Sequence, residues 1–263
     1  MDLIQTLILG FIQGVTEWLP VSSTGHLRIA ERAMGLQIPI LFDGLLHVGT
    51  IIVTFVFFRK DVRNILATLW KRDFKTENGQ LIPLIIVGTV PTALIGVVFG
   101  NTIEAAFSNF LPIAGAFAFC GVALYISKIG NETKTSLSYT DALVIGTAQG
   151  IAIIPGVSRS GLTIATALLL GMKREKAFKF SFLLSVPAIT GALGLTVYTE
   201  YDALILAGVG WTEILAGIAF SMVAGYLALT LLSRILLRKK FHWFAFYCWL
   251  MAIVLVGLSL SGL

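Results

Sequence analysis

Apolar runs of about 20 residues recur along this chain, and they constrain its fold more than any other feature of the sequence. A helix of that length crosses the roughly 30 Å apolar core of a bilayer. The composition agrees, because 57% of the residues are hydrophobic, only 13% are charged, and the mean hydropathy is +0.90. We therefore predict an all-α polytopic membrane protein.

The basic residues fall between these runs in an alternating pattern that predicts the topology. We expect spans at about residues 44–58 and 81–99, a third that ends at 126, and three more at 177–198, 211–232 and 242–260. Most of the 19 lysines and arginines lie in every second loop, as in cytoplasmic loops. The loops predicted to be cytoplasmic lie near Lys71, Lys134, Lys176 and Lys239. Both termini and the loops near Asn101 and Asp202 are predicted to be extracytoplasmic.

A polar motif interrupts this apolar pattern near the N-terminus and returns 136 residues later. The first copy spans residues 10–26 and the second spans 146–161, with identical residues at one constant offset. The copies differ in their chemistry. At three matching positions the first copy has Glu17, Ser23 and His26, whereas the second has an isoleucine, Arg159 and a leucine.

Each motif is predicted to form a re-entrant helix-loop-helix, because some thirty residues with a polar centre are too few for two crossings. Each half of the chain, 1–136 and 137–263, then holds one re-entrant hairpin and three spans. Since three is odd, the halves must have opposite orientations. The sequence therefore predicts an inverted-topology repeat in one membrane domain, with two helix N-termini converging on an anion.

Four side chains in the motifs are candidates for catalysis. Glu17 is a carboxylate within the membrane core, where charge is usually functional, although it could serve only as a structural partner of Arg159. Arg159 suits planar, bidentate phosphate binding. We favour Ser23 as the nucleophile with His26 as its base, and attack by His26 or by a metal-bound water stays open. A role of Ser23 as a simple hydrogen-bond donor to phosphate is the other alternative.

Further residues of the two breaks are candidate substrate contacts. They are Gln13, Ser22, Thr24, Gly25, Ser158, Ser160 and Gly161. His47 is left open between a chemical role and that of a satisfied buried imidazole. The net charge of +5 follows from the loops, so we expect no nucleic-acid partner. Cys120 and Cys248 lie in apolar runs without metal-ligand spacing, which argues against a disulfide or a zinc site.

Three motifs in this order resemble the bacterial undecaprenyl-diphosphatases, the family associated with bacitracin resistance and also called UppP or BacA. They are Gln13-x-x-x-Glu17, the run from Pro20 to His26 and the run from Pro155 to Gly161. The resemblance covers essentially the whole chain. Gln13 replaces the first acid of the family pattern.

The resemblance implies hydrolysis of undecaprenyl diphosphate to the monophosphate, which recycles the lipid carrier for peptidoglycan synthesis and cell wall biogenesis. It also implies a divalent cation, Mg²⁺ or Ca²⁺, held by Glu17 and Gln13. The site would face the periplasm or the exterior of a bacterial inner membrane, and a lateral gap between spans would admit the polyprenyl tail from the surrounding membrane lipids.

A transporter or lipid-carrier flippase is the alternative, because inverted repeats with broken helices are a transporter architecture. The motifs favour the enzyme, because they supply a candidate nucleophile, base, metal ligand and phosphate-binding group, which substrate binding alone does not require. The sequence leaves a homodimer open.

Overall fold

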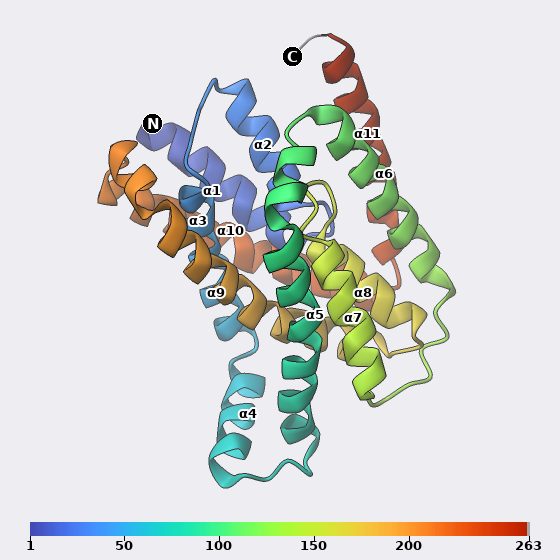
Figure 1. Ribbon diagram of the computed structural model, residues 1–263. Coiled ribbons are helices and arrows are strands. Elements are labelled where there is room, and N and C mark those ends of the chain that lie inside the picture. Colours follow the sequence, from blue (N-terminus) through green and yellow to red (C-terminus); the bar gives the residue numbers. More distant parts are fainter. Residues whose placement is uncertain (262–263) are drawn as a thin grey trace.

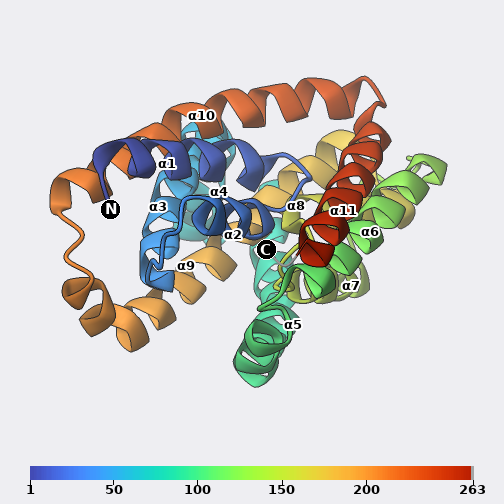
Figure 2. The same ribbon diagram turned by 90° about the horizontal axis from the view of Figure 1, so that it is seen from above.

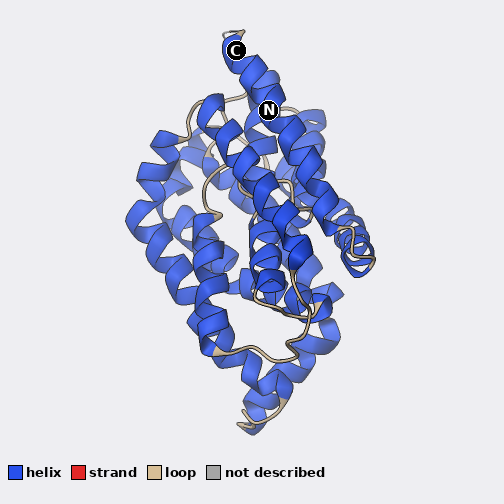
Figure 3. Cartoon of the chain, turned by 90° about the vertical axis from the view of Figure 1, so that its right-hand side faces the viewer, coloured by secondary structure: helices blue, strands red, loops and turns tan. Residues whose placement is uncertain are grey.

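The computed structural model describes residues 1–261, and they form eleven α-helices and two short 3-10 turns (Figure 1). The helices are α1 (Leu3–Trp18), α2 (Ser23–Ala33), α3 (Ile40–Phe57), α4 (Arg59–Lys71), α5 (Glu77–Ala106), α6 (Phe110–Ile126), α7 (Tyr139–Ile151), α8 (Arg159–Leu169), α9 (Arg174–Leu206), α10 (Trp211–Leu237) and α11 (Phe244–Leu260). The 3-10 turns are Ser127–Ile129 and Phe241–Trp243. Figure 3 shows how little of the described chain lies outside helices.

Six of these helices are long and apolar enough to cross a membrane, and they match the six predicted spans. They are α3, α5, α6, α9, α10 and α11. Two are longer than expected, since α5 has 30 residues and α9 has 33. The prediction of an all-helical, multi-pass membrane protein is confirmed at this level.

Both motifs break the chain into pairs of short helices, as predicted. The first pair is α1 and α2, and the second is α7 and α8. In each pair the second helix begins after a serine whose hydroxyl accepts a hydrogen bond from a glycine N–H three residues later. Ser22 caps α2 through Gly25, and Ser158 caps α8 through Gly161. None of the four helices is long enough to be a spanning candidate.

Small residues allow two helix pairs to approach closely. α1 lies along α10, as Figure 2 shows, and a Cβ atom on Gly10 would be 2.6 Å from the carbonyl oxygen of Gly217. α7 lies along α5, where a Cβ atom on Gly146 would be 2.0 Å from the carbonyl oxygen of Gly88. These contacts are the packing that small residues support in membranes, where lipid offers no hydrophobic driving force.

The segment near Lys71, predicted as a cytoplasmic loop from its charge, contains the amphipathic helix α4. Its valine, isoleucine and leucine residues recur at helical spacing between the basic ones, a pattern that a count of charges does not detect. α4 packs beside the lower end of α5 (Figure 1). Lys179 of α9 forms an ion pair with Asp61 of α4, which ties this hairpin to the bundle.

Candidate active site

The two breaks meet, although more than a hundred residues separate them along the chain. The hydroxyl of Ser22 accepts a hydrogen bond from the Gly156 N–H at 3.1 Å, in addition to the one from Gly25. On the other side, the Ser160 hydroxyl donates to the Leu19 carbonyl at 3.4 Å. The N-terminal ends of α2 and α8 therefore lie at one buried point, as the convergence of the motifs predicts.

Glu17 is the centre of this point, and only 7% of it is exposed. One carboxylate oxygen, Oε1, forms an ion pair with Arg159 of α8. The other, Oε2, accepts a hydrogen bond from the Ser23 hydroxyl at 2.5 Å and one from Gln13 Nε2 at 3.2 Å. The Glu17 carboxylate thus contacts Arg159 of the second motif and both Ser23 and Gln13 of the first.

His47 of α3 also contacts Glu17, with its Nε2 3.3 Å from Oε2. Its Nδ1 lies 2.8 Å from the carbonyl oxygen of Asp43, one helical turn earlier. Both ring nitrogens therefore face acceptors, an arrangement that the doubly protonated imidazole satisfies. The sequence left the role of His47 open, because the residue stands outside both motifs and only its proximity in space brings it to the site.

His26 is directed away from Ser23. Its Nδ1 lies 2.8 Å from the Ser22 carbonyl oxygen, and its Nε2 lies 2.7 Å from the hydroxyl of Tyr247 on α11. The two rings are stacked with centroids 5.7 Å apart. Because the carbonyl can only accept, Nδ1 carries the proton and Nε2 accepts from Tyr247 when the ring is neutral. The hydrogen bond expected between His26 and Ser23 is not formed, and Glu17 takes that place.

Tyr247 was missed by the sequence reasoning altogether. It lies in the last apolar span, where a tyrosine reads as an ordinary membrane aromatic. No spacing links it to His26, which is 221 positions away along the chain.

Two buried polar atoms at this point have no hydrogen-bond partner among the described residues. One is Nη1 of Arg159 and the other is Oε1 of Gln13. A buried polar atom without a partner is costly, so such atoms indicate a place that a ligand completes. Arg159 also lies 5.4 Å above the ring of Trp18, which helps to hold its guanidinium plane.

The remaining predicted contacts surround the centre. Gly25 packs against Phe117, where a Cβ atom would come within 2.7 Å of the ring. Ser158 and Ser160 have their hydroxyl oxygens 3.2 Å apart at the start of α8, whereas Thr24 is exposed. Cys120 and Cys248 are buried, free cysteines, and Cys120 accepts a weak hydrogen bond from the Ser158 N–H.

The oxygen atoms at this point suit a cation that is bound jointly with a phosphate better than a cation that is bound by protein side chains alone. Within residues 1–261, no group of three or more His, Cys, Asp or Glu side chains could hold a metal ion. Glu17 and the unpartnered Oε1 of Gln13 still offer two oxygens. Magnesium is commonly bound by one or two carboxylates together with waters and substrate phosphates, and this set is compatible with that mode.

Comparison with known proteins gives consistent matches along the chain. The family described as "Bacitracin resistance protein BacA" matches residues 6–254. A protein of Carboxydothermus hydrogenoformans named undecaprenyl-diphosphatase is 40% identical over 100% of this chain and 99% of its own length. Proteins of the same name from Halothermothrix orenii and Methanosphaera stadtmanae are 39% and 35% identical, each over 98% of this chain and 99% of their own length.

Proposed function

The chain belongs to the BacA family of bacitracin-resistance proteins, and we propose on that premise that it acts as an undecaprenyl-diphosphatase. The reaction hydrolyses undecaprenyl diphosphate to undecaprenyl phosphate and inorganic phosphate. Full-length similarity to relatives that carry this name supports the activity. The structural observation that carries it is the meeting of Glu17, Ser23 and Arg159, from two separate breaks, at one buried point.

Arg159 is proposed to bind the phosphoryl group that is transferred. Its Nη2 holds Glu17, while its Nη1 has no partner among the described residues, so one arm of the guanidinium is free for a phosphate oxygen. The first-turn N–H groups of α2 and α8 add partial positive charge at the same point. Donors fixed in this way stabilise the charge on the equatorial oxygens in the transition state.

Ser23 is proposed to attack the terminal phosphorus. Its Oγ–P bond forms as the bond to the oxygen of undecaprenyl phosphate breaks, and water then releases phosphate from the serine. The acceptor within reach of the hydroxyl proton is Glu17, which Arg159 and His47 orient. For His26 to serve as the base, its ring must first leave Tyr247.

A divalent cation carried by the diphosphate is proposed to contact Glu17 and Gln13. When bound, it would neutralise charge on the diphosphate and polarise its oxygens. Gln13 supports the proposal because its Oε1 is buried and free to accept, while its Nε2 donates to Glu17. Loss of phosphate release after dialysis against a chelator, restored by Mg²⁺ or Ca²⁺, would test this; full activity after dialysis would refute it.

An inverted repeat of residues 1–136 and 137–263 is proposed to form this site. Its support is a reciprocal exchange, since the first helix of each half packs on a span of the other half. α1 packs on α10, and α7 packs on α5. Gly10 and Gly146, which occupy the same position in the two motif copies, make the close approach in each case. A two-fold axis in the membrane plane would produce this exchange.

Phosphate release by the purified protein in detergent tests the proposed activity. Hydrolysis needs no separate compartments, whereas a flippase needs two. One inorganic phosphate for each undecaprenyl phosphate formed is the expected result. Binding of undecaprenyl diphosphate without any release of phosphate would favour the flippase.

A further inference from the structure

α4 presents an apolar stripe that the described chain leaves exposed. Leu66, Leu69 and Trp70 recur at helical spacing, so their side chains share one face of the helix. They are 59%, 49% and 90% exposed, and no residue of α4 is buried. Phe74, in the turn that follows, is 45% exposed. A contiguous apolar surface of this kind marks a site of contact with a membrane or with another protein.

Exposed basic side chains flank this stripe. The segment 59–75 contains two acidic residues and six basic ones, which are Arg59, Lys60, Arg63, Lys71, Arg72 and Lys75. None of the six forms an ion pair with another described residue, whereas Asp61 is paired with Lys179 of α9. Arg63 lies one turn from Leu66 and two turns from Trp70, so basic and apolar surface run side by side along the helix. The positive charge is therefore free to bind an anion.

Two spans place α4 at the surface of the membrane. The helix begins two residues after the end of α3 and lies beside the first turns of α5 (Figure 1). A Cβ atom on Gly79, in the first turn of α5, would lie 2.7 Å from the Thr68 side chain. The apolar part of α5 begins at Leu81, so Thr68 lies at the level at which this span leaves the hydrocarbon. The end of α4, which carries Trp70, therefore lies at the depth of the lipid headgroups.

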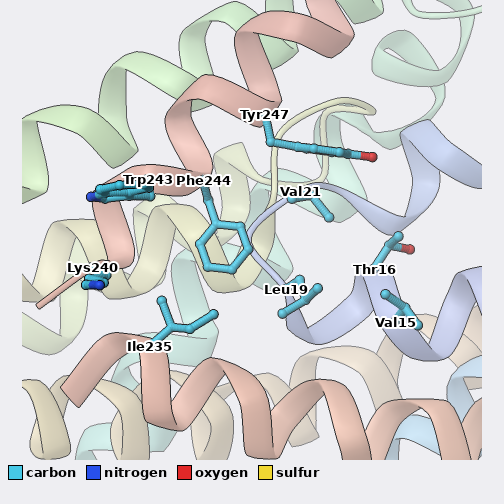
Figure 4. Close-up of a pocket in the computed structure, with 9 residues that line it drawn as sticks. All are labelled: Val15, Thr16, Leu19, Val21, Ile235, Lys240, Trp243, Phe244 and Tyr247. Atoms are coloured by element: carbon cyan, nitrogen blue, oxygen red, sulfur yellow. The ribbon is translucent and has the colours of Figure 1, made fainter. Parts of the chain in front are cut away.

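The turn between α10 and α11, on the side predicted to be cytoplasmic, shows the same combination of residues. Trp243 is 62% exposed, and the centre of its ring lies 5.7 Å from the ammonium of Lys240 (Figure 4). Tryptophan and lysine suit the boundary between a membrane and water, because each has an apolar body and a polar end. This second pair supports an interfacial position for α4.

We propose that α4 docks on the anionic phospholipid headgroups of the cytoplasmic leaflet. Its apolar stripe packs among the upper parts of the acyl chains, and its basic side chains bind lipid phosphates. A helix with an apolar face and a basic flank is typical of this position, and each lysine or arginine near an anionic membrane surface adds attraction. Depth favours lipid over a soluble protein partner. The proposal goes beyond the proposed catalytic function, since no residue of 59–75 lies at the site.

Fluorescence of Trp70 in the full-length protein tests this docking. The protein is reconstituted in phosphatidylcholine bilayers that contain a fixed fraction of a brominated lipid, which quenches the tryptophans that it contacts. The brominated lipid is either phosphatidylglycerol, which is anionic, or phosphatidylcholine. The chain has five tryptophans, so the signal of Trp70 is the difference between the wild type and Trp70→Phe.

Brominated phosphatidylglycerol should quench Trp70 at least about threefold more strongly than brominated phosphatidylcholine. A triple variant, Arg59→Gln with Arg63→Gln and Lys71→Gln, should bring the two values within about 1.5-fold of each other, because the attraction to the anionic lipid is lost. Salt at about 1 M should do the same in the wild type, since it screens charges beyond about 3 Å.

The matched control removes the same charge from other exposed positions on the cytoplasmic side, through Lys173→Gln with Arg234→Gln and Arg238→Gln. It should keep the preference for phosphatidylglycerol. Both triple variants should melt in detergent within about 3 °C of the wild type, which shows that they are folded.

Three results would overturn the proposal. The first is equal quenching of the wild type by both lipids, which would show that charge plays no part. The second is a preference that survives in the α4 variant or is lost equally in both triple variants. The third is the absence of quenching by either lipid, which would show that α4 extends into water, where its partner would be a soluble protein.

Discussion

Glu17 is the residue on which the geometry of the site depends. Its two carboxylate oxygens hold Arg159, Ser23 and Gln13 in place, and His47 approaches from a third helix. A buried carboxylate that is paired and hydrogen-bonded on several sides orients its partners, because each of them would lose a buried contact by moving.

Ser23→Ala tests the nucleophile. The substitution removes the attacking oxygen but leaves Arg159 free to bind substrate, so turnover should fall by far more than tenfold while binding persists. Steady-state phosphate release gives kcat, and retention of a labelled substrate gives binding. If more than about a tenth of the wild-type kcat remained, a loss under about 1.4 kcal/mol, covalent attack by Ser23 would be excluded.

Arg159→Lys tests the proposed binding of the phosphoryl group by Arg159. The charge is kept, but an ammonium group cannot bind one oxygen of Glu17 and one of phosphate with a rigid planar fork. We expect a loss of about 2 kcal/mol or more in transition-state stabilisation, about 30-fold in kcat/KM. Arg159→Ala should be worse still. Turnover close to that of the wild type in Arg159→Lys would show that a point charge is sufficient.

The sequence could single out Glu17, Ser23 and Arg159 as candidates, because polar side chains inside apolar runs are rare and usually functional. It could not identify the partners that folding supplies. His47 and Tyr247 come from spans outside the motifs, and their contacts with Glu17 and His26 depend on how α3 and α11 pack. For the same reason, short spacing along the chain wrongly suggested that His26 would contact Ser23.

At the scale of elements, the site depends on α2 and α8, whose N-terminal ends are buried inside the protein. Ser22 adopts the left-handed region at φ 67°, an uncommon conformation for a residue with a side chain. Its hydroxyl both caps α2 and holds the N–H of Gly156 from the other break. The breaks, the caps and the six spans were predictable from proline, serine and hydrophobic length, whereas α4 required attention to periodicity.

Gly146→Ala tests the helix packing that sets the breaks against each other. The new methyl group would lie 2.0 Å from the Gly88 carbonyl oxygen, so α7 must move away from α5. We expect destabilisation of about 1–3 kcal/mol, seen as a lower melting temperature in detergent. Gly115→Ala in α6 is the matched control, because no neighbouring atom lies within 4 Å of its new methyl group. Equal melting temperatures for the two variants would contradict the close packing.

At the scale of the whole molecule, the charge pattern predicts which side of the membrane each loop occupies. The same pattern predicts that the site opens to the extracytoplasmic side. The six spans and both hairpins fit the alternation of basic and non-basic loops.

Labelling of single cysteines, in a protein with Cys120 and Cys248 replaced, tests this topology. Cysteines at Lys134 and Lys176, which flank the second hairpin, should be labelled from the same, cytoplasmic side. A cysteine at Asp202 should be labelled from the opposite side. Labelling of the first two positions from different sides would show that the second motif crosses the membrane.

A diphosphatase site centred on Glu17 is tested by comparing phosphate release from undecaprenyl diphosphate by the wild type and by Glu17→Gln. The amide keeps the shape of the side chain but loses the negative charge that pairs with Arg159 and that would accept the proton of Ser23 in the proposed attack. Glu175→Gln, at an exposed position at the start of α9, is the control. We predict one phosphate per substrate from the wild type and the control, and a loss of at least about a hundredfold in Glu17→Gln. Equal phosphate release by all three proteins would contradict a diphosphatase site centred on Glu17.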